Sequence, residues 1–194
     1  SNGSLEAYDC CFKDNEATGG SDGGVFGGGI YSSLTVENCL FTGNSAGDDG
    51  GVFGKNIDFA SIRNSTFASN SCAGDGSVFY VHGTEGTNEM SNCTFVTNTG
   101  DVAIHLNNDM GAVVSCLFVD NDGAFDNLGL DYVSYCVADD ELPEGAYNNQ
   151  ENVADASIAL GILADNGGQT DTYALGAGSV AIDAGSNSQS LAYD

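Results

Sequence analysis

The sequence predicts an all-β fold, a parallel β-helix of about six coils, and three observations lead to it. The phrase Cys-x-Phe-x-x-Asn recurs along the first two thirds of the chain, with Phe-to-Phe spacings of 29, 26, 28 and 23 residues. A second phrase, Asp-Gly-Gly-Val-Phe, falls between copies of the first. The segments around both phrases are short, alternate in polarity and are bounded by Gly, Asn, Asp and Ser, which is typical of strands. Units this short cannot close a core alone, so they must stack on their neighbours.

The first phrase places the core and the bends of each coil. Its copies begin at Cys10, Cys39, Ser65, Cys93 and Cys116, and a degenerate sixth copy surrounds Cys136. With one copy per coil, equivalent residues lie above one another at about 4.8 Å per coil. The recurring Cys and Phe then form internal stacks, and the Asn residues occupy bends, where a left-handed backbone suits them. Six coils give a rod about 30 Å long.

The second phrase contains a candidate interface. It occurs at residues 22–26 and 49–53 and weakens at 75–79 and 100–104. If its Val points inward, alternation turns Phe26, Phe53 and Phe79 outward as an apolar stripe on which a partner could dock. The alternative places the Phe residues inward, or bulges the strand at the glycines.

The chain divides into predicted coils over residues 1–145 and a Gly- and Asn-rich segment over 146–194 without the repeat. We expect this segment to cap one end of the same domain or to supply a strand to a neighbour. No signal-peptide pattern opens the sequence, and nothing cap-like precedes the first coil. A solenoid end exposes strand edges and an open core, so the chain is a fragment or another subunit covers that end. Heterologous end-to-end contact of that kind gives filaments.

The charge excludes several classes of partner. Asp and Glu number 28 against three cations, Lys13, Lys55 and Arg63, for a formal net charge of −25. Such a chain cannot displace counterions from nucleic acid, and an anionic membrane surface repels it. No apolar run of 18 residues occurs, so we expect no membrane insertion. Hydrophobic residues make up 41% of the chain, which argues against disorder.

Two resemblances point to a secreted protein. The repeat phrases resemble those of bacterial polymorphic outer-membrane proteins, whose passenger regions are right-handed parallel β-helices. Residues 163–175, LADNGGQTDTYAL, and 178–185, GSVAIDAG, resemble the tail signature of choice-of-anchor Q proteins, with Val180 in place of the usual Pro and Tyr173 where His is common. The resemblance implies a right-handed helix and an extracellular or cell-surface location, and it names no reaction.

An enzymatic alternative starts from the few cations. Parallel β-helices include polysaccharide lyases and glycosidases, and a lyase needs a cationic base such as Lys55 or Arg63 beside aspartates that hold Ca²⁺. The sequence spacing places no group of three acidic residues beside either cation. A glycosidase needs a pair of carboxylates, and among so many acidic residues the spacing does not single out one pair. We expect His82 and His105 to be solvated strand residues.

Calcium is the more plausible ligand, because loops rich in Asp, Asn and Gly offer the oxygens that Ca²⁺ prefers. The candidate ligands are Asp48 with Asp49, Asp120 with Asp122, and residues 139–141 with Glu144. The alternative is a solvated acidic surface. Neither an EF-hand loop nor a nonapeptide calcium repeat is present.

The cysteines of the first phrase should form an inward ladder of small buried side chains. Neighbouring coils place them within disulfide range, so Cys93–Cys116 or Cys116–Cys136 could oxidise in a secreted setting. Cys11 and Cys72 are the candidates for an exposed thiol or an intermolecular bond.

These observations favour a non-enzymatic, extracellular structural or adhesive protein that self-associates end to end. A carbohydrate-active enzyme or glycan-binding module is the alternative.

Overall fold

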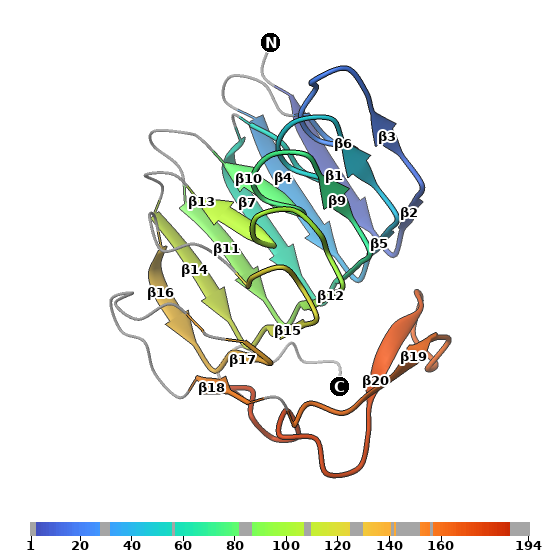
Figure 1. Cartoon of the computed structure of the whole chain (residues 1–194), viewed down its shortest axis with the longest axis vertical. Helices are drawn as coiled ribbons and strands as arrows, with labels where there is room; N and C mark the ends of the chain where they lie inside the picture. The colour runs from blue at the N-terminus through green and yellow to red at the C-terminus, as the bar shows by residue number, and fades with distance from the viewer. Residues whose placement is uncertain are drawn as a thin grey trace.

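The computed structural model describes residues 3–27, 32–55, 57–81, 87–106, 110–124, 130–140, 142, 152–155 and 157–186. All of the regular structure in these ranges is β-strand, and no helix occurs in them. The strands stack as a parallel β-solenoid, followed by an antiparallel hairpin (Figure 1). The predicted all-β parallel fold is therefore confirmed.

The first sheet of the solenoid has one strand from each of six coils. Its strands are β1 (Ser4–Tyr8), β4 (Ser32–Glu37), β7 (Ile57–Arg63), β11 (Thr87–Ser91), β14 (Met110–Val114) and β16 (Leu130–Ser134). The parallel register pairs equivalent repeat positions, such as Ala7 with Val36 and Val36 with Ile62. One copy of the repeat is thus one coil, as the spacing predicts.

The second sheet carries the Phe of the first phrase. Its strands are β2 (Cys11–Lys13), β5 (Leu40–Thr42), β8 (Thr66–Ala68), β12 (Thr94–Val96), β15 (Leu117–Val119), β17 (Val137–Ala138) and β18 (Val153–Ala154). The rings of Phe12, Phe41, Phe67, Phe95 and Phe118 form one continuous stack, with centroids 4.7 to 5.0 Å apart and planes within 11°. The predicted inward Phe stack is therefore the centre of the core.

Shorter segments close each coil. They are β3 (Glu16–Ala17), β6 (Ser45–Ala46) and β9 (Ser71–Cys72) in one sheet, and β10 (Phe79–Val81) with β13 (Ile104–Leu106) in another. Isolated parallel β-bridges extend both of these sheets to further coils. One joins Ser71 to Thr99, and two others join Phe53 to Phe26 and to Phe79. Among the described residues, four successive coils carry all of these segments, so the complete turns number about four, fewer than the six that the sequence predicts.

The Asn of the first phrase forms a hydrogen-bonded ladder along one corner, which is fully buried at Asn44, Asn70 and Asn98. The Oδ1 atom of Asn44 accepts the backbone N–H of Asn15 at 3.1 Å and its Nδ2 at 2.8 Å. The Nδ2 of Asn44 donates in turn to the carbonyl of Phe12 at 3.1 Å and to Asn70 Oδ1 at 2.9 Å. The residue before each of these Asn residues has a positive φ, as at Asp14 and Gly43. The left-handed backbone conformation therefore lies one position before the Asn, whereas the sequence predicts it at the Asn itself.

The second phrase turns both Val and Phe inward, so the outward stripe of Phe26, Phe53 and Phe79 is wrong and the alternative with inward Phe residues on a bulged strand is the one that forms. The amides of Val52 and Phe53 both donate to the carbonyl of Val78, at 3.1 and 2.8 Å. This shared acceptor makes a local bulge, which breaks the alternation. Phe53 and Phe79 are fully buried and Phe26 is half-buried, so they belong to the core.

The repeat continues further than the sequence indicated. The backbone N–H of Cys136 donates to Asn152 Oδ1 at 2.7 Å, just as that of Cys39 donates to Ser65 Oγ at 3.1 Å. Asn152 therefore takes the Cys position of a partial seventh copy, and β18 pairs with β17.

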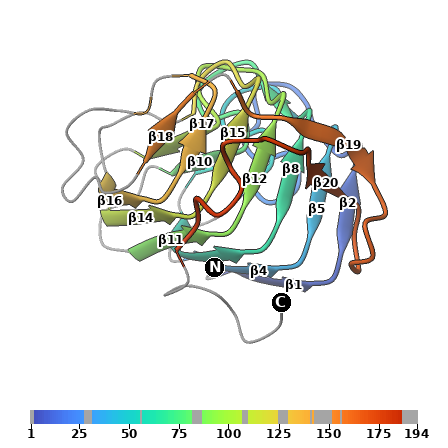
Figure 2. The ribbon, with the colours of Figure 1, turned by 90° about the horizontal axis from the view of Figure 1, so that it is seen from below.

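The hairpin of β19 (Leu160–Ala164) and β20 (Thr172–Leu175) lies alongside the second sheet (Figure 2). Thr170 Oγ1 donates to the carbonyl of Asn38 in the second coil at 3.3 Å. The backbone N–H of Ser186 donates to Ser115 Oγ in the fifth coil at 2.9 Å. The described part of the C-terminal segment is thus a side strap on the rod as well as an extension of its end.

Candidate functional site

Three carboxylates from two coils surround the ammonium of Lys55. Its Nζ lies 2.8 Å from Asp49 Oδ2, 3.2 Å from Asp22 Oδ1 and 3.8 Å from Asp48 Oδ2. The Lys55 side chain is 33% exposed and that of Asp49 only 12%. The expectation that no acidic trio accompanies Lys55 is therefore wrong. Asp22 and Asp49 each begin a copy of the second phrase, so their equivalent positions in the sequence repeat could have predicted that stacking of the coils brings them together.

Backbone geometry fixes this row of aspartates. The N–H of Asp49 donates to Asp22 Oδ1 at 3.2 Å, and the N–H of Asp75 donates to Asp49 Oδ1 at 2.9 Å. The following Gly50 has a φ of 67°, and a Cβ there would lie 2.2 Å from the carbonyl oxygen of Phe53. The first glycine of the Asp-Gly-Gly pattern therefore forms a turn whose backbone conformation and space admit only glycine. The Asp before it links successive coils through hydrogen bonds to its carboxylate.

The cluster keeps Lys55 charged. Hydrogen bonding to Asp49 raises the pKa of Lys55 well above its usual value, against the opposing effect of burial, and Asp22 adds to the increase. Burial alone would raise the pKa of Asp49, but the hydrogen bonds from Lys55 and the Asp75 N–H, with the charges of Lys55 and His105, lower it. Lys55 is protonated at neutral pH and holds no lone pair with which to act as a base.

Tyr80 lies between this cluster and His105. Lys55 Nζ is 5.5 Å from the Tyr80 ring centroid, and the His105 ring is stacked on Tyr80 at 4.8 Å with 24° between the planes. His105 is only 8% exposed, so the expectation of a solvated strand histidine is wrong. The parallel register of β10 and β13 places Tyr80 beside His105, and their contact covers the imidazole. His82 lies outside the described residues.

Two groups of metal-ligand atoms lie near Tyr80 in the described part of the chain. The first consists of the carboxylates of Asp22, Asp48 and Asp49, and the second of Asp75, Asp101 and His105. In each group the ligand atoms lie within 4.8 Å of one another.

The calcium candidates have different surroundings. Asp48 and Asp49 belong to the Lys55 cluster, where the ammonium already supplies positive charge. Asp122 Oδ2 accepts the N–H of Gly100 at 2.9 Å, and the N–H of Asp120 donates to Asp139 Oδ2 at 2.7 Å. Among the described residues, Asp120 and Asp122 belong to neither group of three ligands.

In the third candidate group the structure describes Asp139 and Asp140, whereas Glu141 and Glu144 lie outside the described ranges. Calcium binding at all of these positions stays a prediction.

The cysteine ladder is confirmed, and all seven cysteines are free thiols. Cys39, Cys93, Cys116 and Cys136 are buried, and each thiol donates to the carbonyl two residues before it at 3.2 to 3.5 Å. Cys11 is exposed, as predicted. Cys72 is half-buried, and burial raises the pKa of its thiol to about 11, which leaves little reactive thiolate at neutral pH.

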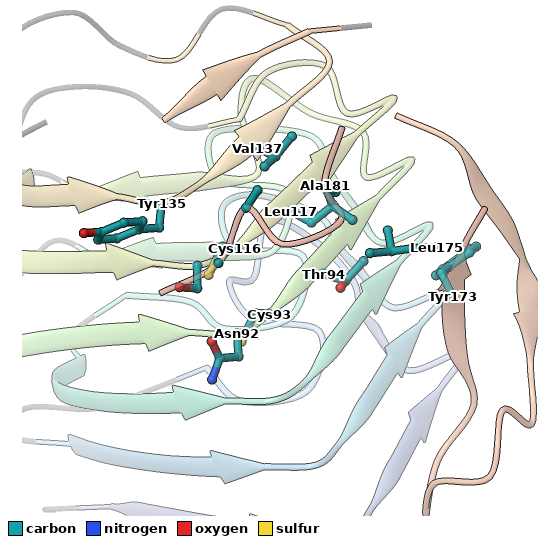
Figure 3. Close-up of a pocket in the computed structure, with 13 residues that line it drawn as sticks. Asn92, Cys93, Thr94, Cys116, Leu117, Tyr135, Val137, Tyr173, Leu175 and Ala181 are labelled. Carbon is teal, nitrogen blue, oxygen red and sulfur yellow. The ribbon is translucent and has the colours of Figure 1, made fainter. Parts of the chain in front are cut away.

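A cavity of about 330 Å³ separates the strap from the second sheet (Figure 3). Thr94, Leu117 and Val137 line it from the sheet, and Tyr173 and Leu175 line it from β20. Burial raises the pKa of Tyr173. The described residues that line it mix polar and apolar side chains, and none of them is a carboxylate, so they do not supply the acid–base pair of a glycosidase.

The fold places the chain among parallel β-solenoid repeat proteins. No family model matches it, and no curated protein or solved structure is significantly similar to it. No helix in the described ranges is long and apolar enough to cross a membrane.

Proposed function

We propose that this chain is a non-enzymatic structural or adhesive β-solenoid of the bacterial cell surface or exterior, which associates end to end into filaments. The resemblance of residues 163–185 to the choice-of-anchor Q signature supports the location. The chemistry of the Lys55 cluster supports a structural role, because its ion pairs join coils and hold the lysine protonated.

The first coil carries the proposal of self-association. Phe12 and Phe26 are half-buried, although the equivalent Phe41 and Phe53 are fully buried. Asn15 is exposed, whereas Asn44 is fully buried in the same ladder. A coil from a second copy, stacked in the same parallel register, would bury these rings and donate hydrogen bonds to Asn15. Apolar burial stabilises by about 25 cal/mol per Å², so such contact favours association.

A head-to-tail arrangement keeps every strand pairing parallel, as all pairings within the solenoid are. The opposite end offers β18, where Val153 is half-buried and Ala154 is exposed. This contact uses two different surfaces, so it propagates as a filament when rotation does not close it.

Sedimentation velocity and negative-stain microscopy over a range of protein concentrations test the proposal. We expect filaments to lengthen with concentration, and Phe12→Lys to shorten them by placing a charge in the contact. Phe59→Lys is the control, because Phe59 is 55% exposed on the outer face of the first sheet. Thermal melting of each variant verifies its folding. A strictly monomeric rod at high concentration overturns the proposal, and a discrete dimer overturns the head-to-tail arrangement.

The sequence alternative, a carbohydrate-active enzyme or glycan-binding module, stays a prediction. Screening neutral and acidic polysaccharides for binding and for release of reducing or unsaturated ends tests it directly.

A further inference from the structure

The second group of ligand atoms differs from the Lys55 cluster because it contains an imidazole. Asp75 lies in a turn of the third coil, Asp101 in a turn of the fourth, and His105 in β13. Their ligand atoms approach within 4.8 Å of one another because the coils stack. We propose that Asp75, Asp101 and His105 form a binding site for a divalent first-row transition metal, with Zn²⁺ the preferred ion. This inference goes beyond the proposed function and does not depend on it.

The donor set matches this class of metal. Zn²⁺ is bound by imidazole nitrogen and carboxylate oxygen, often through three protein ligands with water in the fourth position. Calcium takes oxygen ligands only, six to eight of them, which this group does not offer. Ligand atoms around a tetrahedral Zn²⁺ lie roughly 3.4 Å apart, given Zn–N and Zn–O distances near 2.1 Å. The three side chains therefore need only a short closing movement to reach the metal.

The three ligands divide between fixed and adjustable positions. The imidazole of His105 is buried and stacked on Tyr80, so little side-chain freedom remains for metal binding to remove. Asp101 is exposed and Asp75 is half-buried, so their carboxylates can rotate toward an ion. The exposed side also gives the ion a path of entry.

The charges around Tyr80 favour a dication at this place. The two ligand groups contain five carboxylates, and the ion pairs of Lys55 join it to those of Asp22, Asp48 and Asp49. Among the described residues, no lysine or arginine forms an ion pair with Asp75 or Asp101. The first group thus has a cation from the chain itself, and a bound metal would supply the positive charge for the second.

Titration of the whole chain with Co²⁺ tests the site, because Co²⁺ bound by protein ligands has visible absorption bands that report its coordination. We expect one Co²⁺ per chain, displaced by Zn²⁺, and a melting temperature that rises with Zn²⁺. Asp101→Asn should weaken binding by at least about 10-fold, since loss of even an outer-shell partner of a metal ligand typically costs about 10- to 100-fold. Asp171→Asn is the matched control, because it removes the same charge from an exposed carboxylate outside both groups and should leave the affinity unchanged.

His105→Gln tests the nitrogen ligand, and melting without metal shows whether this variant folds. If it does not fold, Asp101→Asn still decides, because Asp101 is exposed. Absence of Co²⁺ bands overturns the proposal. Equal loss of affinity in Asp101→Asn and Asp171→Asn also overturns it, since that result means general attraction to an acidic surface. Binding of Ca²⁺ as tight as that of Zn²⁺ refutes a role for the imidazole.

Discussion

Removing one rung of the Asn ladder should destabilise the solenoid far more in the middle than at the end. Asn70 is fully buried, and its side chain makes four hydrogen bonds. It accepts the N–H and Nδ2 of Asn44, and it donates to the carbonyl of Phe41 and to Asn98 Oδ1. At about 1 kcal/mol for each bond, Asn70→Ala should cost about 4 kcal/mol.

Asn15→Ala is the control, because Asn15 has the same phrase position in the first coil. Its exposed side chain makes one of the ladder bonds, from Nδ2 to Asn44 Oδ1, so the loss should be about 1 kcal/mol or less. Urea unfolding followed by circular dichroism measures both free energies. With a slope of about 2 kcal/mol/M, the midpoint of Asn70→Ala should fall by roughly 2 M. Equal midpoints for the two variants would refute the ladder as a source of stability.

The other predictions concern glycine geometry, a buried amide and pH. Gly50→Ala should cost more stability than Gly20→Ala, by at least about 1 kcal/mol in urea unfolding, because both have positive φ but only Gly50 lacks space for a Cβ. Asn88→Val should raise the melting temperature, since neither amide atom of buried Asn88 has a hydrogen-bond partner among the described residues and removing such a group gains about 1–3 kcal/mol; a lower melting temperature would contradict this. The lowered pKa of Asp49 gives stability that is present above its unfolded value of 3.8 and is lost as the pH falls through its folded pKa. In Lys55→Met the carboxylates repel one another once ionised, so its melting temperature should fall relative to that of the wild type as the pH rises through that range.

The repeat made the fold predictable, because register follows from equal spacing. Phe41 lies beside Phe67 in the structure as the phrases place them, and Cys39 and Cys93 are buried as expected. Alternation failed where the backbone departs from a regular strand. The bulge that turns both Val52 and Phe53 inward depends on one carbonyl accepting two amides, which no pattern of polarity records.

The candidate site was only partly predictable for a similar reason. Asp48 and Asp49 were identified from local composition, but Asp22 joins them through stacking of the second phrase. His105 was misplaced because alternation along one strand says nothing of what the neighbouring coil places against it. Tyr80 covers it, and that contact depends on the register of two strands 25 residues apart.

The strap also sets a limit on how the rod can change length. Its two attachments, Thr170 to Asn38 and Ser186 to Ser115, span three coils, or about 14 Å along the axis. Insertion or deletion of a coil between them would shift one attachment by about 4.8 Å, which is more than a hydrogen bond tolerates. The strap therefore fixes the number of coils between Asn38 and Ser115, and coils can be duplicated without breaking an attachment only outside this interval.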